Sequence, residues 1–516
     1  MSEKVDIIFI TPNNSKNIYQ DLSNKYAAIE TPTWSLLLAE SCRSLDYKVS
    51  ILDTLATNMP DEKSFEYISQ KKPRLICFVV YGQNVNAGTT NMSGAIRLSK
   101  YIKEKKLKIP IIFVGSHVQA LPSQTLEKEK SIDIVCTNEG VYAIRNLLKL
   151  NKFNSSELRN IKGIFFRDNE SIIKNPPEKI VPNERMDVDL PGYAWDLLPY
   201  NAKPFDLYRS PMWHAEYKEE NRSPYAAIQT SLGCQFGCNF CMINIINRDD
   251  NEEIGVAGNY SKMRFWSTEF IFKEFLKLFE YGVYTIKITD EMFLLNPKYY
   301  KPLCELLKKE NKHNKFKFWA YSRIDTVKRP EILNLVRDAG IKWLCLGIES
   351  GEKKVRLEVS KGKFEDVDVR AVVQKIHEAD IEVLANYIFG LPGDTFESMQ
   401  KTLDLSLELC TLGWNGYAAM ALPGSELFKS AIKLGHKLPE DYEGYSFHSY
   451  NTIPLPTENL KPYEILKFRD DAFKKYFDYE PFLKKIEKKF GKKARQNISE
   501  MNRITLKRKI LEDRNL

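Results

Sequence analysis

The segment "SLGCQFGCNFCMIN", residues 231–244, holds three of the chain's nine cysteines. Cys234, Cys238 and Cys241 follow one another at steps of four and three positions. Three closely spaced thiolates can bind three irons of a 4Fe-4S cube and leave the fourth iron without a protein ligand. An open position on a redox metal can accept a small molecule, as the open position of a catalytic zinc does. The spacing therefore predicts a cluster with one iron open to a ligand.

A structural zinc site is the other interpretation of neighbouring cysteines, and it needs a fourth ligand. The nearest histidines are His214, 20 residues before Cys234, and His313, 72 residues after Cys241. These separations favour the cluster over zinc.

Strand-like apolar runs alternate with helical stretches around and after the cysteines. The helical stretch "VRAVVQKIHEA" (369–379), for example, carries its apolar residues on one face. Repeated βα units predict a full or partial barrel over residues 223–425, with the working residues at the carboxyl ends of the strands. The strand-like runs are "YAAIQTS" (225–231), "YTIKITDE" (284–291), "FKFWAYSR" (316–323), "KWLCLGIES" (342–350) and "IEVLANYIFG" (381–390).

The first 150 residues show the same alternation with β-branched, unalternating apolar runs, which are typical of strands buried on both faces. They predict a doubly wound, Rossmann-like parallel sheet with ligands at the carboxyl ends of its strands. The runs are "VDIIFIT" (5–11), "KVSILD" (48–53), "RLICFVV" (74–80), "IPIIFVG" (109–115) and "IDIVCT" (132–137).

Two further regions complete the predicted α/β organisation. Residues 151–222 form a connector, in which "IKGIFFRDNESIIK" (161–174) predicts a hairpin and a proline-rich stretch follows. Residues 426–516 are basic and carry helical patterns. A chain of 516 residues is long enough for these several domains.

Composition limits the partners and the compartment. The net charge of +8 is a small excess of 76 basic over 68 acidic residues, so we expect no nucleic-acid partner. No run approaches 18 consecutive apolar residues, and the start "MSEKVDIIFITP" lacks a secretory pattern. An odd number of cysteines without such a signal favours reduced thiols. We therefore expect a cytoplasmic protein without a membrane span.

The order "GCQFGCNFC", "ITDE", "GIESG" and "GLPGDT" after a strand resembles the radical S-adenosylmethionine (SAM) superfamily over about residues 223–425. The resemblance implies that the open iron binds SAM. It also implies that the reduced cluster, fed by an electron donor such as flavodoxin or ferredoxin, cleaves SAM to a 5′-deoxyadenosyl radical.

The same resemblance implies contacts to SAM at the carboxyl ends of the strands. They are Phe240 near the adenine, Asp290 and Glu291 at the methionine amino group, Arg323 at the carboxylate, Glu349 and Ser350 at the ribose, and Gly390 in the turn after the fifth strand.

The first 150 residues resemble the cobalamin-binding subclass of that superfamily, through "FVGSHVQALPSQTL" (113–126) and "DIVCTNEGVYAIRNLL" (133–148). The loop "DTLATNMP" (53–60) has no histidine after its aspartate, which excludes an imidazole ligand to cobalt from that loop. His117 either contacts the side chains of the corrin or bonds to a backbone group. The cobalamin contacts implied by the resemblance are Asp53, Gly115, His117, Glu139 and Gly140.

Two cofactors of this kind predict a methyltransferase that acts on an unactivated carbon of a small metabolite. In this hypothesis SAM provides the radical and cobalamin delivers the methyl group. Tyr445 and His448 are candidates for contact with the substrate, and the alternative is that they pack the terminal helices onto the barrel.

Three other functions stay open at this point. The same cofactors serve oxidative cyclases and ring-rearranging enzymes. RNA methylthiotransferases place three cluster cysteines in a first domain, where this chain has Cys42, Cys77 and Cys136. The third alternative is a sensor that binds a corrin or a cluster and catalyses no reaction.

Overall fold

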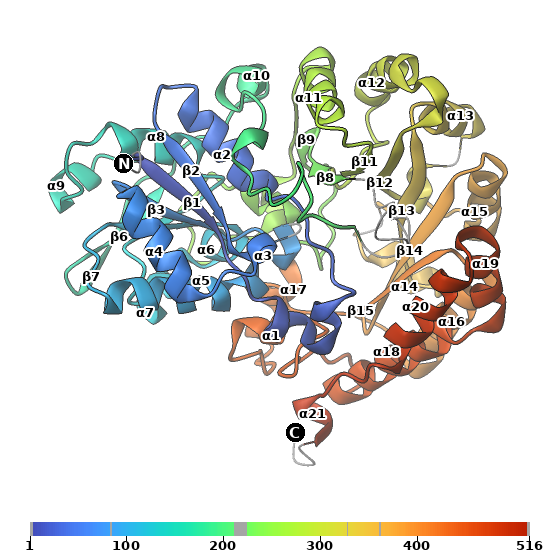
Figure 1. Ribbon diagram of the computed structural model, residues 1–516. Helices are drawn as coiled ribbons and strands as arrows, with labels where there is room; N and C mark the ends of the chain where they lie inside the picture. The colour runs from blue at the N-terminus through green and yellow to red at the C-terminus, as the bar shows by residue number, and fades with distance from the viewer. Residues whose placement is uncertain (1–3, 83–84, 211–223, 328, 361–362, 513–516) are drawn as a thin grey trace.

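The computed structural model describes residues 4–82, 85–210, 224–327, 329–360 and 363–512. Two sheets stand side by side, the first with its helices in blue and cyan and the second in green to orange (Figure 1). The predicted α/β class is confirmed. The predicted boundary between the connector and the second domain, at 222–223, lies outside the described residues.

The first sheet has seven strands in the order β2-β1-β3-β4-β5-β6-β7. The first five are parallel, as predicted, and β6 and β7 are antiparallel additions. The hairpin predicted in the connector is therefore present and extends this sheet. Its strands are β1 (Ile7–Thr11), β2 (Val49–Asp53), β3 (Leu75–Val79), β4 (Ile111–Val114), β5 (Ile134–Cys136), β6 (Ile164–Asp168) and β7 (Ser171–Lys174).

Helices cover both faces of this sheet. Successive side chains of β1 point to opposite faces, so Ile7 and Phe9 join one apolar cluster while Ile8 and Ile10 join another. The helices of this part are α1 (Ser15–Tyr19), α2 (Thr33–Arg43), α3 (Thr54–Thr57), α4 (Asp61–Lys71), α5 (Gly88–Glu104), α6 (Ser116–Ala120), α7 (Pro122–Lys128), α8 (Val141–Lys149), α9 (Ser155–Leu158) and α10 (Met186–Asp189).

The second sheet has six parallel strands in the order β15-β14-β13-β12-β11-β8. Its edge strands do not pair with each other within the described residues, so it is a half-barrel, the partial form of the predicted barrel. Its strands are β8 (Tyr225–Ile228), β11 (Thr285–Ile288), β12 (Lys317–Arg323), β13 (Ile341–Glu349), β14 (Glu382–Phe389) and β15 (Gly413–Ala418). The short strands β9 (Ser231–Gly233) and β10 (Met263–Phe265) form a separate antiparallel pair.

The two faces of the half-barrel differ in polarity. The outer face is apolar, and Phe318 on it packs against Phe275 of α11 (Thr268–Glu280) with ring centroids 5.6 Å apart. The inner face is polar: Asn415 Nδ2 donates to Asn386 Oδ1 at 3.0 Å, and Asn386 Nδ2 donates to Cys345 Sγ at 3.1 Å. A parallel sheet with two covered faces is usually apolar on both, so the polar inner face indicates a binding space.

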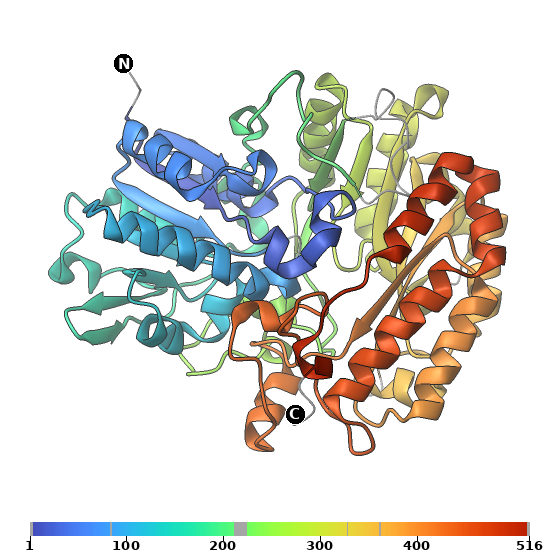
Figure 2. The ribbon, with the colours of Figure 1, turned by 60° about the horizontal axis from the view of Figure 1, so that its bottom comes forward.

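Helices α11 to α16 flank the half-barrel, and the C-terminal helices, red in Figure 2, lie along it on the side away from the first sheet. The predicted helical C-terminal region is confirmed. These helices are α11 (Thr268–Glu280), α12 (Pro297–Glu310), α13 (Pro330–Asp338), α14 (Lys353–Glu358), α15 (Val369–Glu378), α16 (Phe396–Leu409), α17 (Glu426–Lys433), α18 (Pro462–Phe477), α19 (Glu480–Phe490), α20 (Lys492–Arg503) and α21 (Lys509–Glu512).

Buried ion pairs join the N-terminal domain to the domain that follows it. Arg264 of β10 binds Glu139 after β5 at 2.6 Å, and Lys287 of β11 binds Glu30 before α2 at 2.6 Å. All four side chains are at most 5% exposed. Removing one partner of such a pair leaves a buried charge uncompensated, which costs about 3–5 kcal/mol. The two domains are therefore firmly joined.

No helix in the described part of the chain has the length and apolar character needed to cross a bilayer.

Candidate functional site

The cysteine segment follows β8 at the carboxyl end of the half-barrel, and Asp290 holds its start. The carboxylate of Asp290 accepts hydrogen bonds from the backbone N–H of Thr230 at 2.5 Å, from the Thr230 hydroxyl at 2.7 Å and from the Ser231 hydroxyl at 2.6 Å. The side chain is buried, and burial raises its pKa. Asp290, predicted as a contact to SAM, thus fixes the loop that carries the cysteines.

The environment of the three thiols fits a cluster. Backbone N–H groups of Phe236 and Ile243 donate to the sulfurs of Cys234 and Cys241, both at 3.5 Å. Burial raises the pKa of all three cysteines to about 12, so they stay protonated unless a metal stabilises the thiolates. All nine cysteines are free thiols.

A single-ion site is not preformed at these thiols. Among the described residues, no three His, Cys, Asp or Glu side chains are gathered as ligands of one ion.

Arg323 of β12 lies against the same segment. Its guanidinium stacks on Phe236, 3.7 Å from the ring centroid, and forms a two-bond pair with Asp325 in which both distances are 2.6 Å. Burial raises the pKa of Cys238, and the charge of Arg323 offsets part of that rise. Since Asp325 already occupies the fork of the guanidinium, a carboxylate of SAM meets Arg323 at most through its remaining N–H groups.

Two half-buried carboxyl groups face the thiols. Burial raises the pKa of Glu291 and of Glu349 to about 7 each. Glu291 acts on the pKa of Cys234 and Cys241, and Glu349 acts on that of Cys238, so both lie close to the cysteines. An ammonium group or a ribose bound beside them would supply hydrogen bonds that these carboxyl groups can accept.

The backbone at Glu349 is held in a left-handed conformation with φ +65°, at the irregularity between Gly347 and Glu349 in the pairing of β13 with β14. A Cβ added to Gly347 would lie 2.4 Å from Oε1 of Glu349. A strained non-glycine residue of this kind is found most often at functional sites. Glycine at 347 therefore makes room for the carboxyl group.

Three other predicted SAM residues have structural partners. Phe240 is half-buried against the apolar core. The Ser350 hydroxyl accepts from the backbone N–H of Glu352 at 3.1 Å at the start of α14. Gly390 has φ +82°, and a Cβ there would lie 2.6 Å from Ile465 of α18. The close approach of α18 is one sufficient reason for glycine at 390.

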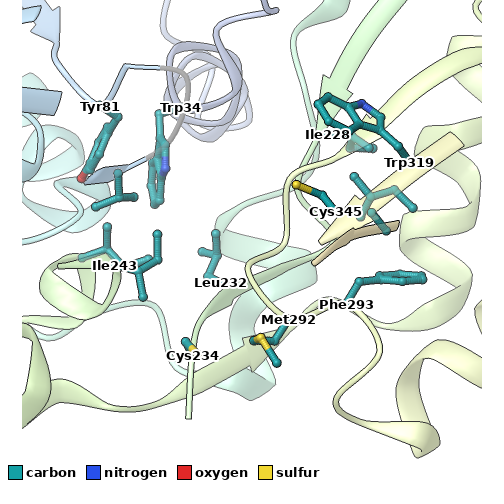
Figure 3. Packing of buried hydrophobic residues seen from close by; sticks show 14 of the residues in the cluster. Trp34, Tyr81, Ile228, Leu232, Cys234, Ile243, Met292, Phe293, Trp319 and Cys345 are labelled. Carbon is teal, nitrogen blue, oxygen red and sulfur yellow. The ribbon is translucent and has the colours of Figure 1, made fainter. Parts of the chain in front are cut away.

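A cavity opens at the carboxyl ends of β1 and β3 in the first sheet, where the strand order reverses. Its empty space, mouth included, is about 730 Å³. Trp34 and Tyr81 line it as a stacked pair with centroids 4.7 Å apart. Figure 3 shows this pair facing the half-barrel, whose Ile228, Trp319 and Cys345 stand opposite. Ligands of doubly wound sheets bind at such a point of reversal.

The short 3₁₀ helix η2 (Val85–Ala87) connects the cavity to the cysteines. Ala87 lines the cavity. Its neighbour Asn86 places Nδ2 3.7 Å from Cys241 Sγ and accepts the backbone N–H of Met242 at 2.9 Å. The cysteine segment and the cavity of the first sheet thus share one wall.

The predicted cobalamin residues with charged side chains are engaged by protein groups. Asp53 accepts from the backbone N–H of Ala56 at 3.0 Å and the Tyr208 hydroxyl at 2.9 Å, and burial raises its pKa to about 6. Glu139 is paired with Arg264. They stabilise loops at the sheet end, and their role toward cobalamin stays a prediction.

The side chain of His117 forms no hydrogen bond to a backbone group among the described residues, and its contact with the corrin stays a prediction. Its Nδ1 lies 3.2 Å from the Thr89 hydroxyl, and its ring meets Tyr442 edge-on at 5.1 Å. Burial lowers its pKa to about 3, so it is neutral. The two predicted glycines have backbone roles: a Cβ at Gly115 would lie 2.2 Å from the carbonyl oxygen of Val80, and Gly140 has φ +84° before α8.

The two predicted substrate residues lie in the 3₁₀ helix η10 (Tyr442–Tyr445) and just after it. Tyr445 is buried, and burial raises its pKa to about 12. The ring of His448 packs on Tyr19, 5.3 Å away, and on Phe447, 4.2 Å away. Because Tyr19 lines the cavity, His448 stands behind its wall.

Sequence reasoning missed Glu30, Trp34, Asn86 and Lys287. A lysine inside the apolar run "YTIKITDE" was the one available signal, because a charge in a buried strand needs a partner. The other three residues have no local signature.

The cysteines of the methylthiotransferase alternative do not form a second cluster site. Cys42, Cys77 and Cys136 lie within the apolar core of the first sheet and are at most 1% exposed. Burial raises the pKa of Cys77 well above its usual range, which favours inert thiols.

Comparison with protein families finds two domains. The model of the radical SAM superfamily matches residues 228–406, and the model of the B12-binding domain matches residues 19–148.

Among curated proteins, an uncharacterized methyltransferase of Pyrococcus horikoshii is 24% identical over 403 residues, 78% of each chain. The anaerobic magnesium-protoporphyrin IX monomethyl ester cyclase of Cereibacter sphaeroides is 23% identical over 88% of this chain and 67% of its own. The cytidylyl-2-hydroxyethylphosphonate methyltransferase of Streptomyces wedmorensis is 24% identical over 63% of this chain and 62% of its own.

Two solved structures share the whole arrangement. The radical SAM methyltransferase TsrM of Kitasatospora setae, with cobalamin and a 4Fe-4S cluster bound, has a TM-score of 0.65 at 13% identity and covers 98% of this chain and 99% of its own. The cobalamin-dependent radical SAM enzyme OxsB, with aqua-cobalamin and SAM bound, has a TM-score of 0.66 at 14% identity and covers 96% of this chain and 70% of its own. These two likenesses show the fold.

Proposed function

Since this chain belongs to the cobalamin-binding radical SAM enzymes, we propose that it is a methyltransferase that adds a methyl group to an unactivated carbon of a small molecule. The two domains bring a 4Fe-4S cluster, SAM and cobalamin as cofactors. Flavodoxin or ferredoxin is the proposed electron donor.

The observation that carries the proposal is the contact of Asn86 with Cys241. It puts the segment for the cluster and the cavity of the B12-binding domain on the two sides of one short helix, η2. A substrate held between them would be within reach of both cofactors. Methyl transfer requires this closeness, because the carbon that loses hydrogen must also receive the methyl group.

When bound, SAM at the cluster supplies a carbon radical that removes hydrogen, and cobalamin supplies the methyl group. The protein's own part is to hold and orient the cofactors. Cys234, Cys238 and Cys241 would bind three irons, and Glu291 and Glu349 lie close to the same thiols. A carboxyl group whose pKa is near 7 gains or loses a proton at neutral pH. In their ionised forms, Glu291 and Glu349 can therefore accept hydrogen bonds from SAM.

The test is an anaerobic reconstitution with iron, sulfide and hydroxocobalamin, followed by a reductant and SAM. A methyltransferase forms 5′-deoxyadenosine from one SAM and S-adenosylhomocysteine from another. We expect both products. Deoxyadenosine without S-adenosylhomocysteine would overturn methyl transfer and favour a cyclase or a rearranging enzyme.

Cysteine variants separate the cluster from general effects. Cys238→Ala removes one of the three proposed iron ligands. We expect it to lower the formation of deoxyadenosine at least about a hundredfold. Cys304→Ala, which removes a buried thiol from α12, is the matched control and should leave the formation of deoxyadenosine unchanged. Full deoxyadenosine formation by Cys238→Ala would contradict the assignment.

A further inference from the structure

The cavity of the B12-binding domain has a hydroxyl-rich lining, and Glu30, the charged residue among its described lining, is paired with Lys287. Thr11 and Ser35 line it, and their hydroxyls are 2.9 Å apart. Neither lysine nor arginine is among the described lining residues. The lining therefore suits a neutral polar group better than a phosphate, which calls for cations or clustered backbone N–H groups.

Trp34 brings an unused hydrogen-bond donor to this cavity. It lies in the first turn of α2 and is 4% exposed. Its Nε1–H is buried and has no hydrogen-bond partner among the described residues. An indole nitrogen is a donor only, and a buried donor without an acceptor is costly. A bound ligand with an acceptor would remove this cost.

Glu30 brings an unused acceptor to the same cavity. One carboxylate oxygen binds Lys287 at 2.6 Å, while Oε2 is buried and has no partner within hydrogen-bond distance among the described residues. The Tyr225 hydroxyl interacts with the same carboxylate. The ammonium group of Lys287 lies over the rings of Trp319 and Tyr321, at 5.1 and 5.3 Å, so the pair is fixed on the inner face of the half-barrel. The free oxygen can accept one further N–H or O–H.

We propose that Trp34 and Glu30 form a subsite for a carboxamide side chain of the corrin ring. The Trp34 N–H donates to the carboxamide oxygen, and Glu30 Oε2 accepts from its N–H. The inference rests on the proposed function, because it takes cobalamin as the occupant of the cavity.

The pairing of a donor with an acceptor decides the chemistry. A carboxylate or phosphate could satisfy Trp34, but Glu30 would repel it. An ammonium group could satisfy Glu30, but it would leave Trp34 without a partner. A neutral group with both functions satisfies both residues, and the rim of cobalamin carries several carboxamides. In this subsite Glu30 would contact the corrin on one side and Lys287, on the inner face of the half-barrel, on the other.

The test uses cobalamin derivatives in which one carboxamide is hydrolysed to a carboxylate. Each monocarboxylate isomer is titrated into the cobalamin-free chain, and its dissociation constant is compared with that of hydroxocobalamin. One isomer should bind wild type at least about tenfold more weakly, because its carboxylate meets Glu30. Glu30→Gln should abolish this discrimination. Glu40→Gln, within α2 and paired with Arg43, is the matched control and should keep it.

A second variant examines the donor. Trp34→Phe keeps an aromatic ring beside Tyr81 and removes the N–H together with the five-membered part of the indole. It should weaken binding of hydroxocobalamin about fivefold and leave the discrimination between isomers intact.

The outcomes separate this inference from the proposed function. Equal binding of all isomers by wild type, or unchanged discrimination in Glu30→Gln, overturns the subsite and leaves cobalamin binding in place. Failure of wild type to bind hydroxocobalamin overturns the proposed function and the subsite together.

Discussion

Two buried charged residues keep the cysteine segment in place from opposite sides. Asp290 holds Thr230 and Ser231 before the first cysteine, and Arg323 stacks on Phe236 after it. The Asp290 carboxyl group is hydrogen-bonded within the protein, and the Arg323 guanidinium is paired with Asp325. Glu291 and Glu349 are the acidic side chains that remain available to a ligand beside the thiols.

The raised pKa of Glu349 predicts a pH dependence of stability. In the folded chain its pKa is about 7, whereas an exposed glutamate has a pKa of about 4.3. Between these two values the folded state binds more protons, so this group lowers the free energy of unfolding as the pH rises. We expect Glu349→Gln to remove up to about 3 kcal/mol of that fall. Urea unfolding of the metal-free protein at about pH 5 and pH 8 measures this fall in the free energy of unfolding. An equal fall in wild type and in Glu349→Gln would contradict the assignment.

At the residue scale, the spacing of the cysteines was the feature of the sequence that indicated a candidate site. The cysteine pattern identified a loop that lies at the carboxyl end of the half-barrel beside Glu291 and Glu349. It could not show that Arg323 is occupied by Asp325, because rotamers and partners are not visible in a pattern. Glu30 and Lys287 are 257 positions apart, so no local signal could pair them.

At the scale of elements, α18 is the helix that covers the edge of the half-barrel. Trp414 of β15 stacks on Tyr476 of α18 at 5.3 Å, and Arg469 donates to the carbonyl oxygen of Gly416 at 2.7 Å. The strands and helices themselves were predictable from apolar runs and helical periodicity. The addition of β6 and β7 to the first sheet was not, because a hairpin sequence does not specify which edge it joins.

Gly390 and Gly393 offer a matched pair that tests the contact with α18. Both have positive φ, +82° and +86°, but only at Gly390 would an added Cβ meet other atoms, those of Ile465. Gly393→Ala should cost about 1–2 kcal/mol for the backbone alone. Gly390→Ala should cost about 1–3 kcal/mol more, because the helix must shift. Urea unfolding measures the difference, and equal costs would contradict the packing.

At the scale of the whole molecule, two buried ion pairs set the B12-binding domain against the half-barrel. One joins Glu139 to Arg264 and the other joins Glu30 to Lys287. The order of the domains was predictable from the sequence. Their relative placement was not, because it depends on these long-range pairs and on the contact of Asn86 with Cys241.

Breaking one of these buried ion pairs should lower the free energy of unfolding. Arg264→Met leaves Glu139 buried without its cation, and we expect a loss of about 3–5 kcal/mol in the free energy of unfolding. Lys262 lies two positions before Arg264 and forms an exposed ion pair with Asp249. Lys262→Met should cost at most about 1 kcal/mol in the free energy of unfolding. Chemical unfolding of both variants measures this, and similar losses would contradict the role of the buried pair.

The central claim is that three cysteines leave one iron of a 4Fe-4S cluster open to SAM. The most direct measurement is the electron paramagnetic resonance spectrum of the reduced, reconstituted chain before and after addition of SAM. The account predicts a 4Fe-4S signal whose g values change when SAM binds the open iron. A spectrum that SAM leaves unchanged, or the absence of a four-iron signal, would contradict it.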